Sequence, residues 1–240
     1  MEHALMDTSV EVASRHSLPV ISFAERDEQA LARQLDQAFS DIGFCYFSDF
    51  GVDQALVDGV FAASRRFHAQ PRAAKDAIAM NRFHRGYMAP KTSIIQTSSV
   101  AKVTKPNDSE SFMLMHEVAL DDPRYGRPLD GPNLWPDLPG FRESVVAYEK
   151  ALHDFCLRLL RPLAVALDLP RDWFLPFFEQ PTTFLRLLHY PPHAMDAAED
   201  AFASPPPTDY GFITILSKDN SGGLEVRRHD GTWLAAPPIE

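Results

Sequence analysis

The stretch SPPPTDYGFITIL, residues 204–216, places an aspartate directly before an apolar segment with strand propensity. Residues two apart on a strand face the same side, so Asp209 would share its side with Pro207. A carboxylate and an imidazole at that spacing can supply two ligands of a transition metal. Proline has neither a side-chain ligand atom nor an N–H. The residues alone therefore leave two interpretations open: Asp209 is the remnant of a metal site, or it is a turn residue before the strand.

A second pair of candidate residues lies on the segment TFLRLLHY, residues 183–190. Arg186 and Tyr190 share a strand face by the period of two, and a guanidinium is suited to bidentate binding of a carboxylate. The alternative is an ion pair between Arg186 and an acid at the sheet surface. His189 falls on the opposite face, which directs it away from Tyr190 and from any pocket beside it.

Several other conspicuous residues are expected to have structural roles. In Arg85-Gly86-Tyr87 the glycine would allow a tight turn, with Tyr87 packed nearby. Three further histidines are predicted to lie at a helix end, in a loop and at a hairpin turn: His68, His193 and His229. None of the three is expected to replace the imidazole that is missing at position 207, because a metal site holds its ligands to within a few tenths of an ångström.

The elements that must position these residues change type along the chain. Apolar residues recur at helical spacing in the first two thirds, and capping residues mark several helix starts. Helices are predicted over 27–42, from Asp53, from Pro71, over about 140–167 and over 171–179. Residues 80–137 contain many prolines and polar turns, which predicts irregular structure there.

Short segments with strand propensity open the chain and fill its last quarter. They are LPVISF (18–23), GFCYF (43–47), TFLRLLHY (183–190), YGFITILS (210–217), GGLEVRR (222–228) and TWLAA (232–236). Asp230-Gly231, between the last two, is a strong hairpin signal. Helices followed by antiparallel strands indicate an α+β fold, in which helices pack against a sheet sandwich or barrel.

Composition argues against several classes of protein. The 240 residues suffice for one large domain or two small ones. A formal net charge of -10 leaves no basic footprint for nucleic acid, and no apolar run is long enough to span a bilayer. The N-terminus has no secretory pattern, and Cys45 and Cys156 lie in apolar segments that favour free, buried thiols. These observations predict a cytoplasmic protein without nucleic-acid or membrane partners.

Fragments along nearly the whole chain resemble the isopenicillin N synthase-like branch of the Fe(II)/2-oxoglutarate-dependent dioxygenases. LPVISF, GFCYFSDFGVDQALVDGVFAASRRFHAQP and RGYMAP resemble its N-terminal region, and LRLLHYPP, PTDYGFITIL and GGLEVRRHDGTWLAAPPI resemble its catalytic core. The order and spacing of the fragments make the resemblance specific. It implies a double-stranded β-helix (jelly roll) core, Fe(II) and 2-oxoglutarate, and oxidation of a small-molecule substrate coupled to decarboxylation of 2-oxoglutarate. Bacterial relatives are often labelled ethylene- or succinate-forming, and that label names no substrate here.

The resemblance also implies roles for single residues. Asp209 matches the metal carboxylate, and Pro207 stands where the first metal histidine belongs. Tyr190 matches a tyrosine that often helps to hold a substrate or co-substrate carboxylate, with Arg186 beside it. The family's second metal histidine and its Arg-x-Ser pair come later than Glu240. We therefore expect two of three metal ligands to be absent, by substitution and by truncation, and this chain to be catalytically inactive. The alternative is a non-catalytic degenerate fragment or a small-molecule binding domain without metal.

These expectations divide the chain into four regions. They are a flexible tail (1–17), an N-terminal dioxygenase region (18–137), a long support helix with a short helix (138–180) and a truncated jelly-roll core (181–240), incomplete at its C-terminus. Within the second region, Glu110-Ser111-Phe112 resembles a strand of the family and is assigned a structural role. An incomplete jelly roll would expose unpaired backbone groups. We therefore expect low stability and self-association through an open sheet edge.

Overall fold

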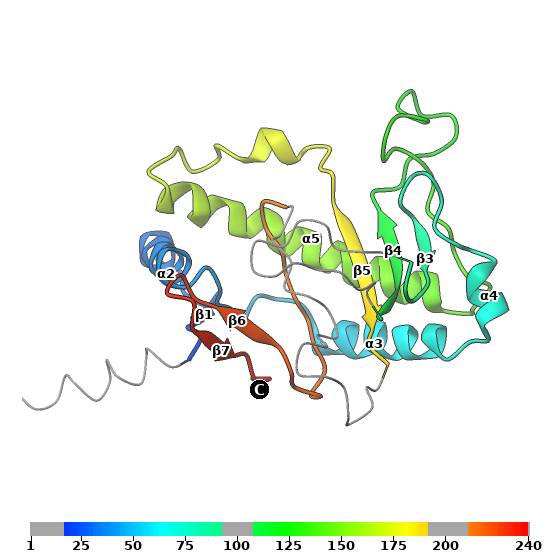
Figure 1. Cartoon of the computed structure of the whole chain (residues 1–240). Coiled ribbons are helices and arrows are strands. Elements are labelled where there is room, and N and C mark those ends of the chain that lie inside the picture. Colours follow the sequence, from blue (N-terminus) through cyan, green and yellow to red (C-terminus); the bar gives the residue numbers. More distant parts are fainter. Residues whose placement is uncertain (1–16, 93–107, 192–210, 240) are drawn as a thin grey trace, which may run out of the picture. The chain divides into compact units, whose positions relative to one another are not determined.

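The computed structural model describes residues 17–92, 108–191 and 211–239 (Figure 1). The chain divides into two compact units. Unit 1 comprises Met1–Val52, Leu152–Glu179 and Ile213–Glu240, and unit 2 comprises Asp53–Ala151 and Gln180–Phe212. The tail expected over 1–17 lies, apart from Ser17, outside the described residues.

Unit 1 combines two small sheets with helices. Its elements are β1 (Val20–Ser22), α2 (Glu28–Asp41), β2 (Tyr46–Ser48), the C-terminal part of α5 (Phe141–Ala166), the 3-10 helix η1 (Leu175–Phe178), β6 (Glu225–Arg227) and β7 (Trp233–Ala235). Strands β1 and β2 pair in parallel, and β6 and β7 form an antiparallel hairpin. The larger core joins Ile21, Leu35, Phe155 and Leu159, with the ring of Phe47 edge-on to Phe155.

Unit 2 holds the three-stranded sheet that carries most of the candidate residues. Its elements are α3 (Gln54–His68), α4 (Arg72–Asp76), β3 (Gly86–Met88), β4 (Glu110–Met115), the N-terminal part of α5 and β5 (Phe184–His189). The sheet order is β3-β4-β5, and both pairings are antiparallel (Figure 1). Strand β4 is therefore central, which explains why five of its six residues are buried.

Local chemistry explains several element boundaries that the sequence predicts. Asp27 and Asp53 adopt extended backbone conformations and cap α2 and α3 by accepting hydrogen bonds from the backbone N–H groups of residues 29 and 55. Gly86 has φ +108°, and a Cβ there would lie 2.4 Å from the carbonyl oxygen of Ile78. The glycine of the RGY motif is thus required by its conformation and by a close backbone approach, as predicted.

Three predicted elements differ in the structure. The region 80–137 is not irregular throughout, because it contains β3 and β4. The segment 210–217 was expected to be a strand, but residues 211–217 contain no regular strand. The helix expected over 171–179 is reduced to the single turn of η1. Strand formation depends on partners distant in sequence, so local propensity misjudged both strand regions.

The structure also describes the two cysteines and the character of the helices. Cys45 and Cys156 are free, as predicted, and burial raises the pKa of their thiols to about 12 and about 11. In the described ranges, every helix is too short or too polar to cross a membrane.

Candidate functional site

The β3-β4-β5 sheet presents two chemically different faces. In the antiparallel register Phe112 lies opposite Leu187, and Ser111 lies opposite Leu188. Alternation then defines a core face, made of Tyr87, Glu110, Phe112, Leu114, Leu185, Leu187 and His189. The opposite face, which we call the Arg186 face, carries Met88, Ser111, Met113, Met115, Phe184, Arg186 and Leu188.

Aromatic packing fixes the core face. The rings of Phe67 from α3 and Phe141 from α5 lie 5.4 and 5.0 Å from the ring of Phe112, measured between centroids. All three side chains are fully buried, and Tyr87 packs edge-on against Phe67. Such close-packed aromatic contacts hold the sheet rigidly against the helices of unit 2.

A buried polar network sits at one end of this core face. The Oε2 atom of Glu110 accepts hydrogen bonds from the Lys75 ammonium at 2.7 Å and from the Tyr87 hydroxyl. Its Oε1 atom accepts one from Nδ1 of His189 at 2.9 Å. Burial alone would raise the pKa of Glu110, but the hydrogen bonds from Lys75, Tyr87 and His189 outweigh it and lower the pKa to about 2. Glu110 is therefore a fully partnered carboxylate, which marks it as structural.

His68 completes the network from the end of α3. Its Nδ1 donates to the carbonyl of Ser64 at 2.9 Å, and its ring packs against the ring of His189 with centroids 5.2 Å apart. Burial lowers the pKa of His68 to about 4, so the ring is neutral near pH 7. His189 points to Glu110 on the core face, which confirms the prediction that it faces away from Arg186.

The Arg186 face is less complete. Nε of Arg186 donates to the Ser111 hydroxyl at 3.1 Å, while its Nη2 is buried and has no hydrogen-bond partner among the described residues. The alternative ion pair with a surface acid is not found in the described ranges. Tyr190 follows β5 directly and is exposed. Phe184 and Leu188 flank the arginine and expose 57% and 36% of their surfaces. This face thus presents a partly buried guanidinium between apolar side chains.

The described residues suit 2-oxoglutarate and Fe(II), the two groups that the family resemblance implies, to different degrees. The unpartnered Nη2 of Arg186 fits a carboxylate such as that of 2-oxoglutarate, because guanidinium N–H groups pair with carboxylate oxygens. Within the described residues, no group of three His, Cys, Asp or Glu side chains could hold a metal ion. Asp209 and Pro207 lie outside the described residues.

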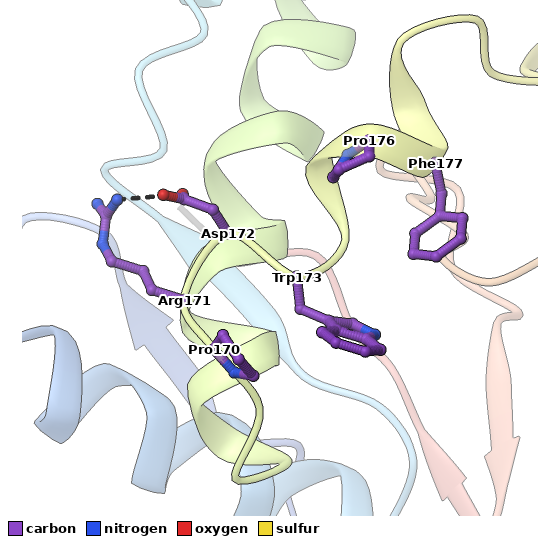
Figure 2. A pocket seen from close by; sticks show the side chains of 6 residues that line it. All are labelled: Pro170, Arg171, Asp172, Trp173, Pro176 and Phe177. Atoms are coloured by element: carbon purple, nitrogen blue, oxygen red, sulfur yellow. Dashed lines mark hydrogen bonds and ion pairs between the residues drawn. The ribbon is translucent and has the colours of Figure 1, made fainter.

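Unit 1 contains a separate cleft of a different kind. A shallow cleft of about 520 Å³ is lined by Pro170, Trp173, Pro176 and Phe177, with Arg171 and Asp172 paired at its edge (Figure 2). Arg171 also pairs with Glu28 at 2.7 Å. The charges of Arg171 and Asp172 are therefore already paired. The cleft offers an apolar surface and no unpaired charged group for binding or catalysis among its lining residues.

Sequence reasoning missed the polar network and the burial of Arg85. The available signals were an acid at the start of an otherwise apolar strand, ESFMLM, and an arginine before the glycine turn. Neither signal names its partner, because Lys75 and His189 lie 35 and 79 residues from Glu110 along the chain.

Comparison with known proteins decides the family. Residues 18–138 match the family described as non-haem dioxygenase in morphine synthesis N-terminal, and residues 181–240 match the 2OG-Fe(II) oxygenase superfamily. The chain belongs to the 2OG-Fe(II) oxygenase superfamily. It is thus a member of an oxidoreductase family that uses Fe(II) and 2-oxoglutarate.

Individual relatives agree with this assignment. Azadirone synthase LFS of Melia azedarach is 30% identical over 240 residues, covering 94% of this chain and 70% of the relative. The structure of a full-length Neurospora crassa protein in complex with alpha-KG and thymine superposes with a TM-score of 0.79 at 26% identity, covering 93% of this chain and 71% of that protein. JOX2 in complex with 2OG, Fe and JA gives a TM-score of 0.74 at 28% identity, covering 93% and 62%.

Proposed function

We propose that this oxygenase-family chain binds a small carboxylate, the 2-oxoglutarate co-substrate or a carboxylate substrate, through Arg186 and Tyr190. The observation that carries the proposal is the buried Nη2 of Arg186, which has no partner among the described residues. A buried charged donor without a partner costs free energy that a bidentate carboxylate would recover. Exposed Phe184 and Leu188 beside it would contact the carbon skeleton of such a ligand.

We further propose that the chain does not complete the family's oxidation. In the family, bound Fe(II) supplies the activation of oxygen. Asp209 would be the retained metal carboxylate, but Pro207 offers no ligand atom at the position of the first histidine. Without an imidazole at position 207 the His-x-Asp pair of ligands is not formed, so these residues do not fit the metal. Retention of the carboxylate-binding face with loss of the metal pair favours a small-molecule binding domain of oxygenase descent.

The proposal also covers the arrangement of the sheets and the free edge of β5. We propose that the sheets belong to a double-stranded β-helix (jelly roll). Among the described strands, β5 pairs only with β4, which leaves its other edge open. Exposed strand edges template pairing with other chains, so the chain would self-associate through β5.

The test of carboxylate binding is calorimetric titration of the purified chain with 2-oxoglutarate. Arg186→Met should weaken the affinity by about tenfold or more, because a charge-assisted hydrogen bond is lost. Arg127→Met is the matched control, because Arg127 is an exposed arginine of the same unit. Equal affinity in both variants would sink the assignment of Arg186.

The test of inactivity is separate. Succinate formation is measured with Fe(II), 2-oxoglutarate and oxygen, against a protein-free control. We expect no succinate above that control. Turnover by the chain as it stands would refute the inactivity without touching the binding proposal.

A further inference from the structure

A small polar cavity in unit 2 lies apart from the residues proposed above. Its volume is about 110 Å³, and the polar side chains that line it include Arg85, Arg124, Asp130, Gln180, Thr182 and Thr183. A space of this size equals about four water molecules in the liquid, which matches an ion as large as phosphate.

Arg85 lines this cavity and is almost entirely buried, with 1% of its surface exposed. Its Nη1 donates to the carbonyls of Phe83 at 2.8 Å and Leu129 at 2.7 Å, and its Nη2 donates to that of His116 at 2.7 Å. Its Nε is buried without a partner, and no carboxylate lies within ion-pair distance in the described ranges. Carbonyl dipoles alone therefore compensate a buried full charge, and one N–H stays unused.

The remaining lining residues add hydrogen-bond donors. Thr182 and Thr183 also line the cavity, and the hydroxyl of each can donate a hydrogen bond. Gln180 accepts from Nη1 of Arg124 through its carbonyl oxygen at 3.3 Å, which leaves its amide N–H groups available. Asp122 already holds the Arg124 guanidinium through two contacts of 2.9 and 3.1 Å. Arg85 is thus the one lining cation without a carboxylate among the described residues.

We propose that this cavity binds a small oxyanion through the Nε–H of Arg85 and the hydroxyls of Thr182 and Thr183. Inorganic phosphate and a short carboxylate share this chemistry, since both offer several acceptor oxygens on a compact anion. The site is distinct from the carboxylate site proposed above, because neither Arg186 nor Tyr190 lines the cavity.

The acids near Arg85 provide a sharp test. Asp130 lines the cavity, and the charges of Glu117 and Asp130 both act on Arg85. An anion entering the cavity would be repelled by Asp130. Asp130→Asn should therefore strengthen oxyanion binding. If the cavity bound a cation instead, the same substitution would weaken binding. If the cavity held only water, the substitution would have no effect on binding.

The experiment is calorimetric titration of the full chain with sodium phosphate and, separately, with sodium acetate, at constant ionic strength. Asp130→Asn should bind the favoured anion about fivefold more tightly than the unmodified chain, by the loss of one nearby like charge. Asp121→Asn is the matched control, because Asp121 is exposed and does not line the cavity. Phosphate binding would identify a tetrahedral oxyanion, and acetate binding a carboxylate.

Two further variants test the role of Arg85 and the specificity of the site. Arg85→Met risks unfolding, because Arg85 donates hydrogen bonds to three backbone carbonyls. Arg85→Lys keeps the positive charge but loses Nε. This variant should weaken anion binding about tenfold. Arg127→Met, at an exposed arginine that does not line the cavity, should bind the anion like the unmodified chain. The proposal is overturned by absence of binding with both anions, by equal tightening in Asp121→Asn, or by loss of binding in Arg127→Met.

Discussion

The two faces of the β3-β4-β5 sheet neutralise their charges in opposite ways. On the core face, every oxygen of Glu110 has a donor, and Lys75, Tyr87 and His189 are held by it. On the Arg186 face, one nitrogen of the guanidinium bonds to Ser111, and Nη2 has no partner among the described residues. Both faces belong to the same strands and alternate residue by residue.

This difference distinguishes structure from function in buried polar groups. The carboxylate of Glu110 gains stability from its hydrogen bonds, and both of its oxygens already have donors. Arg186 makes one hydrogen bond, to Ser111, and keeps its Nη2 for a ligand. The contrast predicts large losses of stability from the core face and small ones from the Arg186 face, as the following variants test.

The largest effect is expected for Glu110→Gln. This change leaves the Lys75 ammonium buried without its carboxylate, which should lower the free energy of unfolding by about 3–5 kcal/mol. Urea denaturation measures the loss. Glu143→Gln, an exposed acid in the first turn of α5, should lose less than about 1 kcal/mol. The double variant Lys75→Met/Glu110→Gln should lose less than the sum of the single changes. Equal losses of unfolding free energy in Glu110→Gln and Glu143→Gln would contradict a stabilising role for the hydrogen bonds around Glu110.

Two adjacent leucines on β5 compare the faces directly. Leu187 on the core face is 8% exposed, while Leu188 on the Arg186 face is 36% exposed. Leu187→Ala should lower the free energy of unfolding by about 3 kcal/mol because it opens a cavity in a packed core. Leu188→Ala should cost less than about 1 kcal/mol. Similar losses in urea denaturation would show that the two faces are equally packed.

His68, at the end of α3, should make stability depend on pH. The pKa of His68 is lowered from 6.5 to about 4 in the folded chain, because burial disfavours its charged form. The unfolded chain therefore binds the proton first as the pH falls, so stability is full above pH 6.5 and declines from pH 6.5 to 4. The decline should be about 3 kcal/mol, because each pH unit between the two pKa values is worth about 1.4 kcal/mol.

The variant His68→Asn tests this assignment. It should flatten the decline between pH 6.5 and 4 in denaturant titrations at stepped pH, whereas His84→Asn, at an exposed histidine, should not. Glu110 acts in a lower window, because its folded pKa of about 2 means that its contribution is lost as the pH falls below about 4.5. A decline that persists in His68→Asn would assign the proton uptake to another group.

Local signals in the sequence predicted much of the framework. The caps Asp27 and Asp53 and the hairpin at Asp230-Gly231 were placed correctly because each depends on chemistry within a few residues. Local propensity did not mark strand β4 in the proline-rich region, because its formation depends on pairing with β3 and β5, and only the family resemblance indicated a strand at Glu110-Ser111-Phe112. The period of two correctly separated Arg186 from His189, because strand alternation needs no knowledge of partners.

The candidate site could be predicted only in part for the same reason. Alternation selects the residues of one face, but it cannot show which of them already have partners. Glu110 and Arg85 looked ordinary because their partners are carbonyls or side chains distant in sequence. The metal half of the site, Asp209 with Pro207, stays a prediction because both residues lie outside the described ranges.

The smallest change in stability is expected for Arg186→Met, and it is the sharpest test of the contrast. The substitution loses one hydrogen bond to Ser111 and removes a partly buried charge whose burial is unfavourable, so the two contributions oppose each other. The free energy of unfolding should change by less than about 1 kcal/mol, while 2-oxoglutarate affinity falls about tenfold. A structural arginine would show the reverse, a large loss of stability with unchanged binding. Parallel urea denaturation and calorimetry on one preparation therefore decide whether the Arg186 face is a binding surface or part of the scaffold.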